Sequence, residues 1–285
     1  VAGAVYSLVS FHSMLLGSIN SRVVLWRQAE KKDGGEVLQE VCHFEAGILA
    51  LHLKAMDDLI VVGDLMYSAQ LLRFNEESST LQELARDATN SWPTAVEMAS
   101  EDLLLCADDS HNIFALSPSK DPVHPSLERI GQFHTGEFVN RLQRTSLNNR
   151  PVDVDNGIVC HEIEQPPAEQ VLWASVDGAI GLVVSFRQSD RFARLLLLQE
   201  AIVEQVCKPD GPLCLGRRDF WVDGQGASPH RGFVDGDLLR TLLELPRERQ
   251  QAIAELAMSR SCAIQKSNCT VESLLHEAES LVRLH

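Results

Sequence analysis

The side chains that could hold a metal ion gather in one polar stretch near the middle of the chain. Its oxygen-bearing residues are Asp153, Asp155, Asn156, Glu162 and Glu164. They faintly resemble a calcium-binding loop, but Ile158 stands where the sharp turn of such a loop needs glycine. Cys160 and His161 are adjacent and have no second Cys/His pair at the spacing of zinc ligands. We therefore expect no metal site and no cofactor.

Spacings typical of catalysis are also absent from the sequence. There is no Gly-x-Ser-x-Gly elbow, no His-Glu-x-x-His pair and no glycine-rich phosphate loop. The acidic pairs Asp57-Asp58 and Asp108-Asp109 follow apolar segments, and acidic residues favour the turns between strands. We expect both pairs to be solvated turns, and we predict that the protein is not an enzyme.

The charge of the chain restricts its partners. The formal net charge is −15, and the densest basic pair, Arg217-Arg218, is followed directly by Asp219. Affinity for nucleic acid rests mainly on neutralising phosphates, and an acidic membrane surface likewise attracts basic segments. The composition therefore favours a protein-binding surface over direct binding of DNA or of a membrane.

The cysteines indicate a reducing compartment. The seven are Cys42, Cys106, Cys160, Cys207, Cys214, Cys262 and Cys269. No two have the Cys-x-x-Cys spacing, and Cys106 lies in an apolar strand, where a buried, reduced thiol is expected. Residues 1–17 lack the basic start of a signal peptide, and no apolar run approaches the length of a membrane span. We expect a cytosolic or nuclear protein.

A short segment of alternating character recurs four times at a nearly constant spacing. It opens at residues 3, 47, 92 and 136, which gives steps of 44, 45 and 44. A period of this length, filled with short strands, is typical of β-propeller blades. Because a blade cannot bury its apolar faces alone, the repeats are expected to stack on one another.

Each repeat continues as strand, polar turn and strand, which predicts a β-hairpin. The four hairpins lie at 15–26, 59–74, 103–116 and 171–184, the last one delayed by a polar insertion at 148–170. Residues 1–186 are therefore predicted to be a partial β-propeller of about four WD-like blades. We expect these residues to form an open arc of stacked blades that folds poorly when it is expressed alone. We also expect the chain to be the carboxy-terminal piece of a longer protein.

After Phe186 the apolar residues recur at three- and four-residue steps, the period of amphipathic helices. The prolines and glycine at 208–212 end a first helix. A second is expected to begin near Asp237 as N-cap, a third to cover 247–258 with Pro246 in its first turn, and a last to follow Thr270. The fold class is thus mainly β, followed by a small α-helical domain at 187–285.

Several blocks of the sequence resemble the family of the damaged-DNA-binding protein large subunit. They are Val62–Met66, Ala85–Asp87 with Trp92, Phe133–Asn140 and Gly232–Leu238. The closing Arg283-Leu284-His285 also agrees with the natural end of that family's chains. The resemblance runs from Val1 to His285 and is weakest at 148–170 and 208–231.

The resemblance implies a role as well as a fold. Members of this family have three propellers and a terminal helical domain, and they are adaptors of a cullin–RING ubiquitin ligase in ubiquitin-dependent proteolysis and DNA damage repair. One propeller, absent from this chain, binds the cullin. The other two hold exchangeable substrate receptors of the WD-repeat type, which dock through a helical motif. Damaged DNA would then be bound only through a receptor, in the nucleus and cytoplasm.

Two sister families share the architecture and provide an alternative. They are the large subunits of the cleavage and polyadenylation specificity factor and of a splicing factor complex, and either would make this chain an RNA-processing scaffold. The blocks Phe133–Asn140 and Gly232–Leu238 favour the ubiquitin-ligase member.

The family's receptor-binding positions fall on eight residues of this chain. They are Ile48, Leu51, His52, Tyr67, Arg86, Trp92, Phe138 and Asn140. Trp, Tyr and Arg are the residue types most enriched as interface anchors. Ile48, Leu51 and Phe138 could equally be blade core, whereas Trp92 and Arg86 are harder to explain as core.

Two of the eight, His52 and Tyr67, depart from the residues expected in animal members of the family. Receptor preference is therefore expected to differ, while the docking surface itself persists. No membrane partner is expected.

Overall fold

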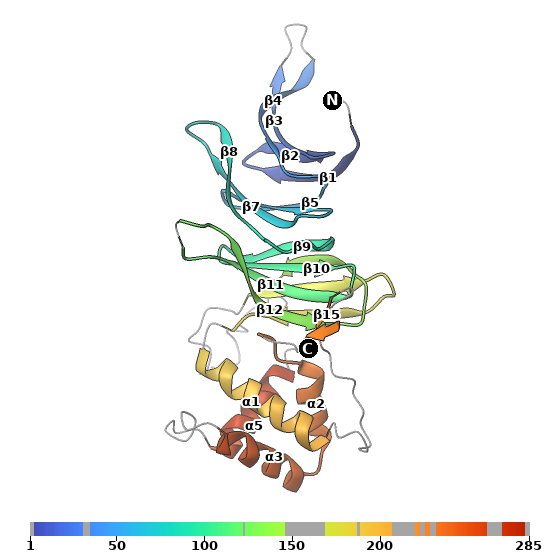
Figure 1. Ribbon diagram of the computed structural model, residues 1–285, viewed down its shortest axis with the longest axis vertical. Helices are drawn as coiled ribbons and strands as arrows, with labels where there is room; N and C mark the ends of the chain where they lie inside the picture. The colour runs from blue at the N-terminus through green and yellow to red at the C-terminus, as the bar shows by residue number, and fades with distance from the viewer. Residues whose placement is uncertain are drawn as a thin grey trace, which may run out of the picture. The chain divides into compact units, whose positions relative to one another are not determined.

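The computed structural model describes residues 3–30, 35–121, 123–145, 169–186, 189–206, 220–222, 226–228, 232–260 and 270–282. These residues form two compact units, one built from strands and one from helices. Figure 1 draws the helices and strands of both units and labels those for which there is room. Each unit is described by itself.

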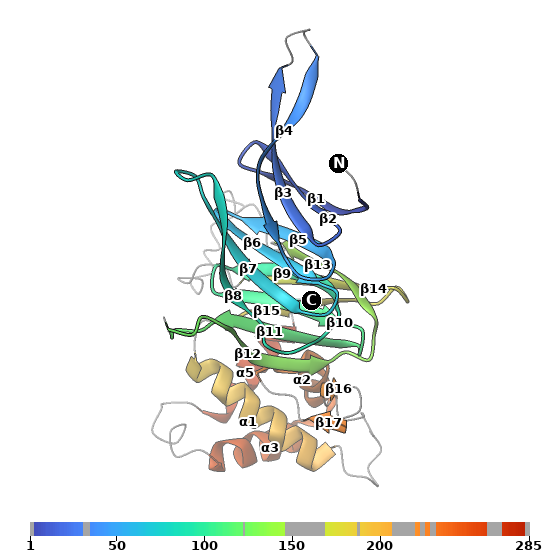
Figure 2. The same cartoon turned by 45° about the horizontal axis from the view of Figure 1, so that its top comes forward.

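Three antiparallel sheets of four strands each open the first unit, and every sheet is wound in chain order. The first contains β1 (Val5–Phe11), β2 (Met14–Ile19), β3 (Arg22–Glu30) and β4 (Glu36–Glu45). The second contains β5 (Ala50–Met56), β6 (Leu59–Asp64), β7 (Ser68–Asn75) and β8 (Thr80–Arg86). The third contains β9 (Pro93–Ser100), β10 (Leu103–Asp108), β11 (Asn112–Pro118) and β12 (Leu127–His134). The sheets follow one another in chain order (Figure 2).

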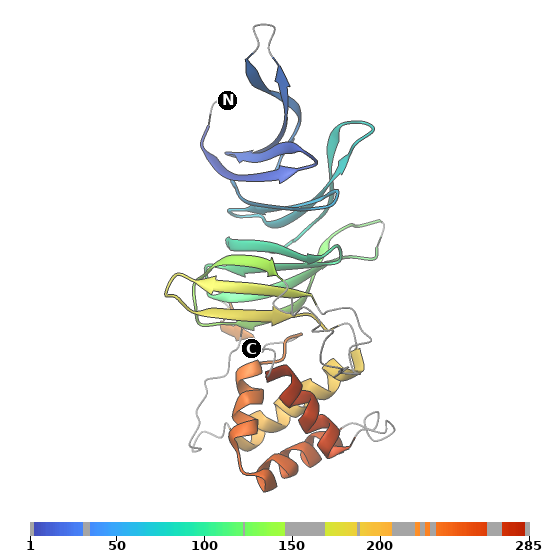
Figure 3. The same ribbon diagram turned by 180° about the vertical axis from the view of Figure 1, so that it is seen from behind.

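The fourth sheet has three strands in the described part of the chain: β13 (Val139–Thr145), β14 (Gln170–Ser175) and β15 (Ile180–Val184). It packs against the third sheet, chiefly through β13 on β9 (Figure 3). The strand unit also includes a short antiparallel pair, β16 (Phe220–Val222) and β17 (Gly226–Ser228), which the sequence analysis did not anticipate. The predicted blade pattern is confirmed, because each of the four alternating openings leads into the first strand of a sheet.

The middle strands explain why the sheets must stack. β6 is buried from end to end, and its side chains alternate between two apolar clusters. Ile60 and Val62 join the cluster with the first sheet, whereas Leu59 and Val61 join the cluster with the third. Successive side chains of a strand point to opposite faces, so a run that is apolar throughout predicts a sheet covered on both sides.

A buried ion pair joins three of the sheets at their first strands. Lys54 Nζ on β5 lies 2.6 Å from Glu97 Oε2 on β9, and it also donates to the carbonyl oxygen of Leu142 on β13. The backbone N–H of Arg144 donates to the same Glu97 oxygen at 3.2 Å. Because both charged groups are mostly removed from water, each depends on the other for its stability.

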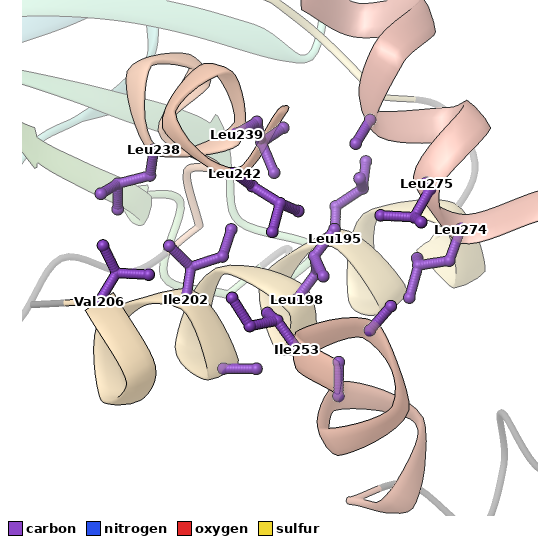
Figure 4. Packing of buried hydrophobic residues seen from close by; sticks show 14 residues of the cluster. Leu195, Leu198, Ile202, Val206, Leu238, Leu239, Leu242, Ile253, Leu274 and Leu275 are labelled. Atoms are coloured by element: carbon purple, nitrogen blue, oxygen red, sulfur yellow. The ribbon is translucent and has the colours of Figure 1, made fainter. Parts of the chain in front are cut away.

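Four helices form the second unit in the described part of the chain: α1 (Ser189–Val206), α2 (Gly236–Glu244), α3 (Arg247–Ser259) and α5 (Val271–Val282). Their apolar stripes meet in one core. Figure 4 shows this core, which includes Leu195, Leu198, Ile202, Leu238, Leu242, Ile253, Leu274 and Leu275. Ion pairing between Arg194 and Glu277 also joins α1 to α5.

The helix starts differ from the prediction in two places. The N-cap of α2 is Asp235, not Asp237, and its carboxylate accepts the N–H of Asp237 at 2.9 Å. Gly236 is already helical, so the last extended residue, which can cap the helix, lies two positions earlier than predicted. Pro246 is the N-cap of α3 and does not lie in its first turn. Thr270 does precede the last helix, and it exchanges backbone-to-side-chain hydrogen bonds with Ser273.

Candidate docking surface

The eight predicted docking residues lie toward the same end of the sheets. Ile48, Trp92 and Phe138 are in the connections that lead into β5, β9 and β13, and Tyr67 is in the β6–β7 turn. The others occupy neighbouring strand positions: Leu51, His52, Arg86 and Asn140. Because neighbouring strands run in opposite directions, the connection into the first strand and the turn between the second and third strands lie at the same end of a sheet.

Asp64, at the end of β6, orders the part of this surface above the second sheet. It is fully buried. Oδ2 accepts the N–H groups of Ile48 and Leu49, both at 2.9 Å, and Oδ1 accepts those of Met66 and Tyr67, both at 3.1 Å. One carboxylate thus ties the connection before β5 to the β6–β7 turn. The sequence signal for it is an aspartate that closes an apolar strand directly before a tight turn.

The Tyr67 ring stands next to this carboxylate, and Arg86 lies within electrostatic range of both. A Cβ placed on Gly47 would lie 2.7 Å from Cδ2 of Tyr67 and 2.8 Å from Oδ2 of Asp64, so only glycine lets the ring and the carboxylate come this close. A hydrogen bond to Glu83 raises the pKa of Arg86, and the nearby Tyr67 and Asp64 act in the same direction.

The turn above the third sheet corrects one expectation. Asp108 is buried rather than solvated, and its Oδ1 accepts the N–H groups of Ser110 and Asn112, each at 3.0 Å. Burial raises the pKa of the Asp108 carboxyl, while the hydrogen bonds from Asn112 oppose that shift. The N–H groups of the turn need an acceptor, and the Asp108 side chain is buried because it provides that acceptor. Asp109 is exposed, as are Asp57 and Asp58.

Trp92 and His52 lie where the second and third sheets meet. The Trp92 side chain is 47% exposed, and the carbonyl oxygen of Trp92 accepts the N–H of Asp109 at 3.3 Å. His52 is half-buried, and burial lowers the pKa of its ring, although a hydrogen bond with the Pro93 backbone opposes this. His52 on β5 thus lies beside Pro93, the first residue of β9, which directly follows Trp92 in the chain.

Phe138 and Asn140 belong to the fourth sheet. The ring of Phe138 meets His111 edge-on, with 5.9 Å between centroids, and its carbonyl oxygen accepts the N–H of Val176. Asn140 is exposed. The ring contact with His111 links Phe138 to the third sheet, while Ile48, Tyr67 and Arg86 form a separate group above the second.

An irregularity at the start of each first strand places two of these side chains, Leu51 and Asn140. The pairing of each first strand skips one residue near its start: Tyr6, Leu51, Thr94 and Asn140. A bulge re-aims the side chain of the extra residue. Leu51 and Asn140 are therefore equivalent positions of the repeat, and Thr94 uses its place to donate to the carbonyl oxygen of Val139 at 2.6 Å.

Two exposed apolar residues at this end of the sheets were missed by the sequence reasoning. Met66 is 52% exposed and adjoins Tyr67, and Tyr6 is 44% exposed at the bulge position of the first sheet. The repeat itself could have found Tyr6, because it is equivalent to Leu51 and Asn140. Ile48, which could have been blade core, is 47% exposed, while Leu51 and Phe138 are half-buried.

Among the described residues, no three His, Cys, Asp or Glu side chains are grouped to hold a metal ion. The acidic stretch 153–164 and five of the seven cysteines lie outside the described residues. Cys42 and Cys106 are free thiols, and burial raises the pKa of the Cys106 thiol well above its usual range. Of the described helices, none combines the length and apolarity needed to cross a membrane.

Comparison with known proteins shows what the chain is similar to. Residues 1–244 match the family model described as the CPSF A subunit region. The chain is 34% identical over 287 residues to DNA damage-binding protein 1 of Oryza sativa subsp. japonica, and 36% identical over 288 residues to that of Solanum lycopersicum. DNA damage-binding protein 1a of Arabidopsis thaliana is 34% identical. Each match covers 99% of this chain and 24% of the relative, so the chain spans about a quarter of these relatives, their carboxy-terminal part.

Proposed function

The chain belongs to the family of the CPSF A subunit region, and from this premise we propose that it is the receptor-docking part of a ubiquitin-ligase adaptor. It holds substrate receptors of the WD-repeat type, while a propeller outside this chain binds the cullin. The protein acts as a scaffold without catalysis of its own. It functions in ubiquitin-dependent proteolysis and in DNA damage repair, in the nucleus and the cytoplasm.

The observation that carries the proposal is the exposed apolar surface at one end of the second and third sheets. Ile48, Met66, Tyr67 and Trp92 are each between 41% and 52% exposed. Large apolar and aromatic side chains held at the surface on an ordered backbone are characteristic of interfaces with other proteins. Asp64 and Asp108 supply that order by binding the N–H groups of the turns.

Charge supports a protein partner rather than DNA. The chain carries a net charge of −15, and Arg86 is the one Lys or Arg among the eight docking residues. Its guanidinium is engaged by Glu83. Damaged DNA would therefore be reached through a receptor, since direct binding needs cations that neutralise phosphates.

The proposal is tested by substitution in the full-length protein. Trp92→Ala and Arg86→Glu should each weaken recovery of receptors by about tenfold, because anchor residues carry most of the binding energy of an interface. Cullin recovery should not change. Val123→Ala is the matched control, since Val123 is an exposed apolar residue in the connection at the opposite end of the third sheet. Unchanged receptor recovery in both variants would refute the docking surface.

The description of the matching family keeps an RNA-processing scaffold as the second candidate. The relatives named DNA damage-binding protein 1 favour the adaptor. The two candidates separate when the full-length protein is titrated at physiological salt with damaged duplex DNA and with receptor helices. Micromolar binding of nucleic acid without a receptor, together with no binding of receptor helices, would revive the RNA-processing candidate.

A further inference from the structure

Three basic side chains gather where β5, β9 and β13 lie side by side, and they are directed toward the ends of these strands, away from the docking residues. Lys54 lies in the second half of β5, and Arg141 and Arg144 lie on β13. Lys54 is half-buried, whereas both arginines are exposed. We call these three residues the basic group. In a chain with a net charge of −15, such a group needs a reason.

Two of the three cations share one neutral acceptor. Lys54 Nζ donates to Oε1 of Gln143 at 3.4 Å, and Arg141 Nη2 donates to the same oxygen at 3.3 Å. Like charges held this close repel each other, and an amide oxygen neutralises neither of them. An anion beside Gln143 would relieve this repulsion.

The third cation has a weak partner. Arg144 Nη1 donates to the thioether sulfur of Met56 at 2.6 Å, and a thioether is a poor acceptor. Within the part of the chain that the structure describes, neither Arg144 nor Arg141 forms an ion pair. Each guanidinium has five N–H donors in a planar fork, so donors remain for a ligand.

The charge balance of the basic group indicates the kind of anion. Glu97 Oε2 accepts Lys54 Nζ at 2.6 Å and the backbone N–H of Arg144 at 3.2 Å. One buried carboxylate therefore stands against three cations, which leaves two positive charges. A phosphate group attached to a small molecule carries about −1.5 to −2 at pH 7, whereas a carboxylate carries a single charge. The guanidinium fork also fits the oxygens of a phosphate.

The neighbouring turns restrict the size of the ligand. The β5–β6 turn exposes Asp57 and Asp58, and the β9–β10 turn exposes Glu101 and Asp102 at the same end of the sheets. These carboxylates repel an extended polyanion such as DNA or an acidic peptide, which would have to pass over the turns. A compact anion approaches the basic group alone.

We infer that the basic group, Lys54, Arg141 and Arg144, binds the phosphate groups of a small molecule, such as a diphosphate or a phosphate ester. Gln143 positions Lys54 and Arg141 for this ligand. The inference goes beyond the proposed function and does not depend on it, because the basic group is directed away from the docking residues.

The test is a calorimetric titration of the full-length protein with inorganic pyrophosphate, without divalent cations. Arg141→Gln and Arg144→Gln should each weaken binding by about tenfold, as expected for the loss of one charge-assisted hydrogen bond. Arg73→Gln is the matched control, since Arg73 is an exposed arginine on β7, the third strand of the second sheet, and it should leave the affinity unchanged. Thermal unfolding should be the same for all three variants, because each replaces an exposed side chain.

Several outcomes would overturn the inference: no binding of pyrophosphate, an affinity that neither Arg141→Gln nor Arg144→Gln changes, or an equal loss in Arg73→Gln. Parallel titrations with a phosphoserine peptide and with duplex DNA test the limit on size. Tighter binding of either one than of pyrophosphate would also refute the small ligand. The adaptor proposal is judged separately, by the dependence of receptor recovery on Trp92.

Discussion

Asp64→Asn should loosen the docking surface without changing its shape. The amide has one acceptor oxygen, so it can satisfy either the N–H groups of Ile48 and Leu49 or those of Met66 and Tyr67, and its NH₂ group faces the other pair. Two backbone donors then lack an acceptor. Each such group costs about 1–3 kcal/mol when buried, and these are partly reached by water, so we expect a local loss of about 2–4 kcal/mol.

Hydrogen exchange of the full-length protein, read by mass spectrometry, measures this loss directly. The segments 46–49 and 65–67 should exchange at least about thirtyfold faster, because 1.4 kcal/mol corresponds to a factor of ten. Asp57→Asn is the control, since Asp57 is exposed at the opposite end of the same sheet and asparagine tolerates its positive φ. Unaltered exchange in both segments would show that the carboxylate does not hold the surface together.

Two further substitutions test the cores of the two units. Lys54→Met leaves Glu97 buried without its cation and should destabilise the strand unit by about 3 kcal/mol. Adding Glu97→Met should recover most of this loss of stability, measured by thermal unfolding. A double variant as unstable as the single one would contradict the pairing. Leu198→Ala removes a fully buried side chain of the helical core and should cost about 2–5 kcal/mol. The half-buried Leu196→Ala should cost less, and an equal cost measured by hydrogen exchange of α1 would refute the assigned core.

The blade repeat follows from short-range patterns and could be predicted from the sequence. Each hairpin joins neighbouring strands through a turn of a few residues, so alternation and turn residues are enough to place it. The fully apolar run Leu59–Val62 even predicts a strand covered on both faces, since both of its sides must be dry. The outer strands were not placed by sequence; β4, for example, is mostly exposed and carries little alternation.

The site was only partly accessible from the sequence, because exposure there depends on pairing between strands. Alternation alone could not decide whether Ile48 or Leu51 faces the core, since the bulge in β5 shifts the pattern by one residue. The prediction that Asp108 is solvated was wrong for a related reason. An aspartate in a turn looks solvated until the turn's own N–H groups are seen to need it.

The sequence by itself determined the strand repeat, the succession of strands and helices, and the family. Each of these rests on residue spacing or on residue identity along the chain. Tertiary structure alone decided that Asp64 binds two separate segments and that Glu83 holds Arg86. Asp64 lies 16 residues from Ile48, and a bulge between Glu83 and Ala85 sets the side-chain directions on β8. Such contacts depend on which strands pair and in which register, and only the folded sheets fix both.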